Sequence, residues 1–325
     1  MKKWLWLVVW SIWAGNLWAN ELLIDLASEI EPGQVAEENE PRLEPESNAG
    51  SEVEEQTEVA TTRKPPAVSL PPVLDEPAAW GYYGEIAPRF WATLDQRYAQ
   101  CATGQVQSPI NLTERQAVNA ASMPGLDIAY RQVPLRLIHS DHGLRGNYPL
   151  GSFIRLGDER YEFTHYIFRT PSEHQLEGFA YPMEIQLYHR DGEGNQVVMS
   201  VIVQEGRDNP ALEKILANLP SEKDRLQVME GQLFNPVSFL PNNKQFYRYL
   251  GSLTTPPCSE GVVWLVFKNP VEASIGQLVR MHELMGDNVR PLQPLNRRLP
   301  LKSWARDGGS NQPPMPRSPG YYFEY

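Results

Sequence analysis

The sequence predicts a mainly β domain of the α+β class over residues 78–306. Two observations predict it. Short runs rich in aromatic and β-branched residues recur along this stretch and are separated by glycine and proline, as expected for strands joined by turns. Apolar residues at helical spacing occur in two segments, 209–219 and 274–285. We therefore expect many short strands and two modest helices.

Two of the runs, 161–169 and 181–189, predict a pair of strands joined by a long turn. Successive side chains on a strand point to opposite faces. One face should therefore carry His165, Ile167 and Arg169 from the first strand and Glu184, Gln186 and Tyr188 from the second. Such polar groups are costly on interior strands unless they are paired or line a cavity. This face is the candidate site; the alternative is an edge pair with one solvated face.

Further elements follow from the same patterns. The runs 135–139, 152–156 and 197–203 predict strands, and the last of them has the apolar character of a buried strand. Residues 247–267 predict a strand, a sharp loop and a second strand. The helix predicted at 209–219 has Pro210 in its first turn, where proline is well tolerated.

The two ends of the chain differ in composition from this domain. Residues 1–19 predict a secretory signal, because two lysines precede an apolar run that is short for a membrane span. The protein should then be periplasmic or secreted; an uncleaved anchor, which would hold it at a membrane, is the alternative. Residues 20–77 are acidic and proline-rich and predict a disordered linker, and residues 307–325 predict a flexible tail.

The charge of the chain bears on its partners. The net charge is −11, and between Glu21 and Ala60 the only basic residue is Arg42. A nucleic-acid partner is not expected, because phosphate binding requires basic patches. The acidic linker suits a spacer, or a bait for a basic protein partner.

Two cysteines occur, Cys101 and Cys258. In an exported protein an isolated pair predicts a disulfide, and the alternative is two free buried thiols. The bond would close a loop of more than a hundred residues, which in the chain-entropy model is worth roughly 4–5 kcal/mol.

Several motifs together resemble the α-class carbonic anhydrase family, across nearly all of Trp80 to Trp304. The matching stretches are Trp80-Gly81-Tyr82, GQVQSPINL (104–112), SEH (172–174), YPMEIQL (181–187), GSLTTPPCSEGVVW (251–264) and NVRPLQPLNRR (288–298). The resemblance implies a large, twisted, mostly antiparallel sheet with short peripheral helices and a cone-shaped site open to solvent. It also places Cys101 and Cys258 where exported members have their disulfide.

The family's chemistry needs three neutral histidines around Zn²⁺, with a fourth position open for the water that attacks CO₂. The family pattern F-H-F-H-T-P-S-E-H lies over residues 166–174 without a gap, and M-E-x-H-L lies over residues 183–187. The three ligand positions are then Ile167, Arg169 and Gln186. This chain therefore resembles the carbonic-anhydrase-related proteins that lack all three histidines, and no zinc or other cofactor is expected. His165, His174 and His189 fall at positions that are not ligands in the family.

Other parts of the family site have matches. Thr254 matches the threonine that orients the zinc-bound hydroxide, and Glu173 matches the glutamate that accepts its proton. Glu184 matches the glutamate that supports the third histidine. Thr255 lies beside Thr254, and His142 falls near the proton-shuttle position. Val198 and Trp264 match the apolar wall of the CO₂ pocket. Inheritance without function is the alternative for all of these residues.

Three functions remain open from the sequence. The first is a catalytically inactive carbonic-anhydrase-like protein that serves as an interaction or scaffold domain for a protein partner. The second is a module that binds bicarbonate or another small anion through Arg169, Glu184 and Gln186. The third is a residual carbonate dehydratase with an altered metal site that includes His165. In the first two, Arg169 needs a partner, and Glu184 on the adjacent strand is expected to form a buried ion pair with it; Glu173 is the competing partner.

Overall fold

The computed structural model describes residues 76–120 and 123–305. The predicted signal segment 1–19, almost all of the predicted linker 20–77 and the predicted tail 307–325 lie outside the described residues. Within those residues no helix is both long and apolar enough to cross a membrane.

The described residues form short strands and a few short helices. In chain order the strands are β1 (Asn111–Leu112), β2 (Val118–Asn119), β3 (Leu126–Ala129), β4 (Val133–Ser140), β5 (Gly143–Asn147), β6 (Phe153–Leu156), β7 (Glu159–Arg169), β8 (Gln175–Leu176), β9 (Met183–Arg190), β10 (Gln196–Glu205), β11 (Gln227–Phe234), β12 (Phe246–Ser252), β13 (Glu260–Phe267), β14 (Val271–Ala273) and β15 (Leu301–Lys302). The α-helices are α1 (Trp91–Leu94), α2 (Gln100–Thr103), α3 (Pro210–Leu216) and α4 (Ile275–Met285). The 3₁₀ turns are η1 (Gly84–Ile86), η2 (Pro88–Phe90), η3 (Gln96–Tyr98) and η4 (Pro236–Phe239).

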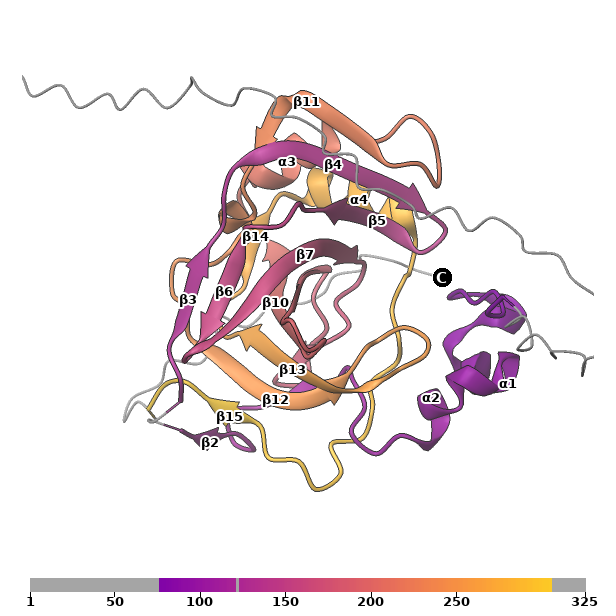
Figure 1. Ribbon diagram of the computed structural model, residues 1–325, viewed down its shortest axis with the longest axis vertical. Helices are drawn as coiled ribbons and strands as arrows, with labels where there is room; N and C mark the ends of the chain where they lie inside the picture. The colour runs from indigo at the N-terminus through magenta and orange to yellow at the C-terminus, as the bar shows by residue number, and fades with distance from the viewer. Residues whose placement is uncertain (1–75, 121–122, 306–325) are drawn as a thin grey trace, which may run out of the picture. The chain divides into compact units, whose positions relative to one another are not determined.

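One twisted sheet of 13 strands organises the domain (Figure 1). Its main path runs β11-β4-β5-β7-β9-β10-β13-β12-β15-β2, while β14 pairs with β10 and β3 joins through β6. Most neighbours are antiparallel; β10 runs parallel to β13 and β14, and β15 runs parallel to β2. A separate parallel pair joins β1 to β8. The predicted mainly β, mostly antiparallel fold is confirmed.

The centre of the sheet is buried on both faces. On β10, Val197, Met199 and Val201 belong to one apolar cluster, and Val198 and Ile202 belong to a second cluster. This explains why the run is apolar almost throughout instead of alternating, since a strand covered on both sides has no solvated face. The strands that carry the candidate site also lie in this buried centre, with β9 next to β10 and β7 next to β9.

Two helices lie where the sequence predicts them. The N-cap residue of α4 is Ser274, which forms a capping box with Gln277. The α3 helix begins at Pro210 and is capped by the Asn209 side chain, but it ends at Leu216, three residues before the predicted end. The 3₁₀ turns and the two short helices near the start of the domain have no sequence-based counterpart.

The predicted disulfide between Cys101 and Cys258 is present, with an S–S distance of 2.06 Å and a Cα–Cα distance of 5.0 Å. It links α2 to the loop between β12 and β13. Arg290 and Gln107 donate hydrogen bonds to the carbonyl oxygens of Cys101 and Cys258, at 2.7 and 3.0 Å. The bond therefore fixes the loop that carries Thr254 and Thr255.

Removing this disulfide should destabilise the domain strongly. The two cysteines are 157 residues apart, and a loop of that length corresponds to about 5 kcal/mol in the chain-entropy model. We expect the double variant Cys101→Ala/Cys258→Ala to lose a large part of that amount in the free energy of unfolding, measured by urea denaturation. An unchanged midpoint would contradict a stabilising role for the bond.

His189 is a core residue in β9. It is 1% exposed, its Nε2 lies 2.6 Å from the Tyr130 hydroxyl, and its Nδ1 lies 3.1 Å from the Val197 carbonyl oxygen. Burial lowers the pKa of His189 to about 3, so the side chain is neutral at pH 7. Its role is therefore packing and hydrogen bonding.

This shift makes stability depend on pH. Unfolded histidine has a pKa of about 6.5, so between roughly pH 6.5 and 3 the unfolded state binds the extra proton. The neutral His189 side chain should contribute fully to the free energy of unfolding above about pH 6.5. This contribution should be lost progressively as the pH falls toward about 3. Denaturation across this range should show a shallower loss of stability for His189→Gln than for the wild type. The same substitution at exposed His142 is the control.

Candidate functional site

The register of β7 and β9 brings the predicted site residues together. His165 is opposite Tyr188, Ile167 is opposite Gln186, and Arg169 is opposite Glu184. Cross-strand partners share one face of a sheet, so the predicted grouping is confirmed. The edge-pair alternative is wrong, because β5 and β10 flank these two strands.

Arg169 holds a positive charge in the interior at 2% exposure. Its Nη1 donates to the Asn288 carbonyl oxygen at 3.0 Å and to the Tyr82 hydroxyl. Its Nε lies 3.5 Å from Oε2 of Glu173, whose side chain has no exposed area. Burial disfavours the charged guanidinium, but Glu173 and Tyr82 hold the pKa of Arg169 above its usual range. The residue is a paired internal cation.

The predicted ion pair of Arg169 with Glu184 is wrong: the guanidinium pairs with Glu173. Glu184 is already surrounded by donors at 2.8–2.9 Å, which are the His174 backbone N–H, His174 Nδ1, Gln186 Nε2 and the Ser200 hydroxyl. Burial raises the pKa of Glu184, but His174 and these hydrogen bonds lower it to about 2. An ionised carboxylate with four donors has no remaining need of a guanidinium.

The expected contact of Glu173 with Thr254 is also absent. Glu173 accepts the Arg290 backbone N–H at 2.9 Å through one oxygen and Gln186 Nε2 at 2.8 Å through the other. Thr254 is fully buried, and its hydroxyl forms no hydrogen bond in the described chain. Both oxygens of Glu173 are therefore used by groups that sequence reasoning did not connect to it.

Gln186 links the two carboxylates. Its Nε2 donates to Glu173 and Glu184, and its Oε1 accepts the Tyr188 hydroxyl at 3.0 Å. The Tyr188 ring stacks on His165, with centroids 4.5 Å apart and planes 9° apart. Because both polar atoms of the Gln186 amide form hydrogen bonds with other side chains, neither is left free to act as a ligand.

Other predicted residues lie around this network. His142 is exposed and stacks on Trp80 with centroids 3.8 Å apart, and its Nε2 lies 3.0 Å from the Trp80 carbonyl oxygen. Thr255 follows Thr254 in the loop after β12, where its carbonyl oxygen accepts the Cys258 N–H. Val198 and Trp264 are cross-strand partners and fully buried. Asn288 links His142 to Arg169, because its Nδ2 donates to the His142 carbonyl oxygen at 3.3 Å and its own carbonyl oxygen accepts from Arg169. Among the described residues, no hydrogen bond or ion pair joins Thr255 directly to the Arg169–Glu173 pair.

Tyr82, Asn288 and Arg290 were not predicted as site residues, although they complete the surroundings of Arg169 and Glu173. All three lie within motifs that the family resemblance had identified. Nothing in the spacing of residues 160–190 points to them, because they are distant in sequence and two of them act through backbone atoms.

The residues that the family resemblance places at the three ligand positions do not fit a zinc ion. Zinc in proteins is held by histidine, cysteine or carboxylate. Ile167 offers no lone pair, the Arg169 guanidinium is a cation that only donates, and Gln186 is already committed. Among residues 76–120 and 123–305, no group of three or more His, Cys, Asp or Glu side chains is placed to hold a metal.

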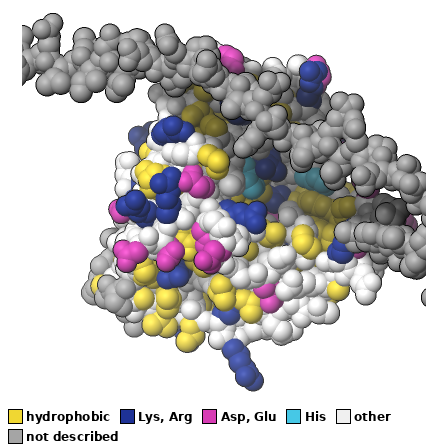
Figure 2. All heavy atoms as spheres, viewed as in Figure 1, with side chains coloured by type: hydrophobic (Ala, Val, Ile, Leu, Met, Phe, Trp, Pro, Cys, Tyr) yellow, Lys and Arg dark blue, Asp and Glu magenta, His cyan; other side chains and the backbone are white. Residues whose placement is uncertain are grey.

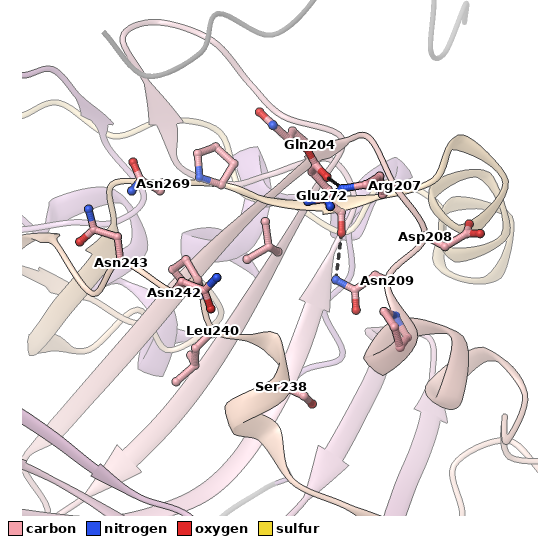
Figure 3. A pocket seen from close by; sticks show the side chains of 14 residues that line it. Gln204, Arg207, Asp208, Asn209, Ser238, Leu240, Asn242, Asn243, Asn269 and Glu272 are labelled. Atoms are coloured by element: carbon pink, nitrogen blue, oxygen red, sulfur yellow. Dashed lines mark hydrogen bonds and ion pairs between the residues drawn. The ribbon is translucent and has the colours of Figure 1, made fainter. Parts of the chain in front are cut away.

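An open groove lies elsewhere, at the end of β10 and the start of α3 (Figure 3). It encloses about 540 Å³ and is lined mainly by polar side chains. Figure 3 shows Arg207 and Asn209 directed toward Glu272, and the structure pairs Arg207 Nε with the Glu272 carboxylate at 2.7 Å. The groove contains none of the predicted site residues.

Together, these features define the α-carbonic anhydrase architecture: the large twisted sheet, the polar face on its central strands and the disulfide-tethered loop. Residues 87–303 match the eukaryotic-type carbonic anhydrase family, and the chain belongs to that family.

Relatives and solved structures agree with this assignment. The carbonic anhydrase of Nostoc sp. is 35% identical over 226 residues, which cover 69% of this chain and 86% of that protein. An α-carbonic anhydrase from Thermovibrio ammonificans, in complex with the inhibitor sulfanilamide, matches with a TM-score of 0.66 at 38% identity and covers 69% of this chain and 99% of that one. A dioscorin complexed with ascorbate matches with a TM-score of 0.64 at 26% identity over 69% of this chain and 97% of that one.

The Arg169–Glu173 pair can be tested by a double-mutant cycle. Arg169→Met leaves an unpaired buried carboxylate and should destabilise the domain by roughly 3–5 kcal/mol. The double variant Arg169→Met/Glu173→Gln should cost much less than the sum of the single changes, measured by chemical denaturation. Arg160→Met, which breaks a more exposed pair with Glu162, is the control and should cost about 1 kcal/mol or less. Additive effects at 169 and 173 would rule out the pairing.

Proposed function

We propose that this protein is an exported, catalytically inactive member of its family that acts as an interaction or scaffold domain. The observation that carries the proposal is the set of side chains at the three ligand positions, Ile167, Arg169 and Gln186. Gln186 donates buried hydrogen bonds to Glu173 and Glu184, and Arg169 forms a buried ion pair with Glu173. Under this proposal, the chain shares its fold with relatives that are named carbonic anhydrase but does not share their activity.

Electrostatics supports the proposal. The paired guanidinium of Arg169 would repel a divalent cation placed beside it. Glu173, the match for the family's proton-accepting glutamate, has both oxygens engaged by Arg290 and Gln186. A metal would therefore have to displace several satisfied buried hydrogen bonds before it met any favourable ligand.

A protein is the partner class that we propose. Because the proposal gives the buried site no catalytic role, the surface of the domain is where a partner would bind. On the face shown in Figure 2, acidic and basic side chains are mixed and do not form one extended basic area. This distribution supports a protein surface over a nucleic acid, which would select a basic stripe.

Small-anion binding in the family pocket is a second candidate, favoured by one observation. The buried Thr254 hydroxyl lacks a hydrogen-bond partner among the described residues, and unsatisfied buried groups are uncommon in folded proteins. A related dioscorin has been solved with ascorbate. Against this candidate, the charge of Arg169 is already compensated by Glu173. Titration with bicarbonate, followed by calorimetry, distinguishes the two: saturable heat that Thr254→Val removes would favour the anion module.

The full chain should show no CO₂ hydration above background, with or without added Zn²⁺. The reason is the chemistry of Ile167, Arg169 and Gln186, which offers no set of neutral nitrogen ligands. Stopped-flow hydration and metal analysis of the purified protein test this. Stoichiometric zinc together with a rate that a sulfonamide inhibits would instead establish a hydratase with an altered metal site.

A triple variant provides the matched positive control. Ile167→His/Arg169→His/Gln186→His should bind zinc if these are the family ligand positions. Its activity should remain low, because His165 and Tyr188 stay next to the restored ligands and the groups around a metal tune it. Failure of the folded triple variant to bind zinc would show that the alignment of these positions is wrong.

A further inference from the structure

The open groove of Figure 3 is lined by three segments that are distant in the sequence. They are the end of β10 with the loop that follows it, within residues 204–210, the end of η4 with the loop after it, within residues 238–243, and the segment that leads into β14, residues 269–272. The groove encloses about 540 Å³, which lies within the range of about 300–1,000 Å³ that is typical of small-molecule sites. The tertiary fold, and not a single loop, therefore shapes it.

Two amide side chains hold the walls of this groove in place. Asn209 Nδ2 donates to the Glu272 carbonyl oxygen at 2.9 Å, and Asn209 Oδ1 accepts two backbone N–H groups of α3 at 3.1 Å. Asn243 Oδ1 accepts the Gln245 backbone N–H at 3.0 Å, and Asn243 Nδ2 donates to the Gln245 side chain at 3.2 Å. Both amides are therefore already used within the protein.

Three other amides of the lining are not used in this way. The side chains of Gln204, Asn242 and Asn269 form no hydrogen bond with any other residue that the structure describes. Each of the three comes from a different segment, and Figure 3 shows Asn242 and Asn209 on opposite sides of the groove. A side-chain amide carries both donors and an acceptor. The groove therefore offers a ligand three neutral groups that can each donate and accept.

The charges of the lining disfavour an anion. One basic and two acidic side chains line the groove, so its formal charge is negative. Arg207 Nε lies 2.7 Å from the Glu272 carboxylate, and Asp208 forms no ion pair with a described residue. A phosphate or carboxylate would meet an uncompensated Asp208 and a guanidinium that is already paired. The ligand that fits these groups is therefore neutral and polar.

Apolar surface lies among these polar groups. It comes from Leu240, Pro241, Pro270 and Val271, of which the first two are buried. A sugar ring matches this combination, because it has C–H groups on its faces and hydroxyls at its rim that both donate and accept. An extended peptide matches it less well, since adding a strand requires a free sheet edge. The adjacent strand β14 has three residues, and its central carbonyl oxygen already accepts Asn209.

We propose that this groove binds a neutral oligosaccharide. Gln204, Asn242 and Asn269 exchange hydrogen bonds with the sugar hydroxyls, and the apolar part of the lining packs against the C–H face of a ring. The volume of the groove suits a disaccharide or a short oligosaccharide. Because the site shares no residue with the Arg169–Glu173 pair or with the network around it, it is independent of the function proposed above.

The free amides report directly on binding. In the ¹⁵N-labelled full chain, Asn242→Ala and Asn269→Ala identify two of the side-chain NH₂ resonances. These resonances should move saturably on titration with at least one of three neutral trisaccharides, which are maltotriose, cellotriose and triacetylchitotriose. Trialanine at the same concentrations is the peptide control and should not move them. The absence of a saturable shift with all three sugars, or an equal shift with trialanine, would overturn the proposal.

Substitutions then locate the bound sugar. Asn242→Ala and Asn269→Ala should each raise the Kd of the bound trisaccharide by about fivefold, as expected for the loss of one hydrogen bond between neutral groups. Gln232→Ala is the matched control, because it removes an exposed amide from β11, outside the groove, and should leave the Kd unchanged. If Asn269→Ala does not fold, as judged by circular dichroism, Asn242→Ala at an exposed position still decides the test. An equal effect of Asn242→Ala and Gln232→Ala would show that the sugar does not bind in this groove.

Discussion

The buried ion pair between Arg169 and Glu173 determines how the polar face of the sheet is arranged. A guanidinium at 2% exposure persists because a carboxylate lies 3.5 Å away and a backbone carbonyl oxygen accepts a hydrogen bond from it. Glu173 in turn accepts a hydrogen bond from Gln186, and Gln186 also donates one to Glu184. One internal cation is thereby connected to two carboxylates, and a change at any of these positions leaves another buried group unsatisfied.

The apolar framework supports this network from both sides. On β10, alternate residues enter two separate apolar clusters, so the strand beside β9 is packed on both of its faces. Within the network, Ser200 of β10 donates to Glu184 at 2.8 Å. The polar face is therefore a small buried polar network inside a sheet that is otherwise held together mainly by hydrophobic burial.

The sequence allowed the strands, their faces and the grouping of site residues to be predicted, because strand periodicity is a local property. It did not identify the partner of Arg169, because that choice depends on donors around Glu184 and on the backbone of Asn288 and Arg290, far along the chain. The edge strand β11 was also missed. Most of its residues are exposed, and its pairing with β4 shifts register between Met229 and Leu233, so no alternating pattern marks it.

Ile167, Arg169 and Gln186 make different contributions to this site. Two carboxylates lie at its centre, and buried carboxylates need donors or cations around them. Arg169 supplies a cation, and Gln186 supplies two N–H groups. His174 and Ser200 provide further hydrogen bonds to Glu184. Ile167 supplies no polar group and packs against the second apolar cluster. Both carboxylates are thus satisfied by protein donors, which come from β7, from β9, from Ser200 on β10 and from the segments that carry His174 and Arg290.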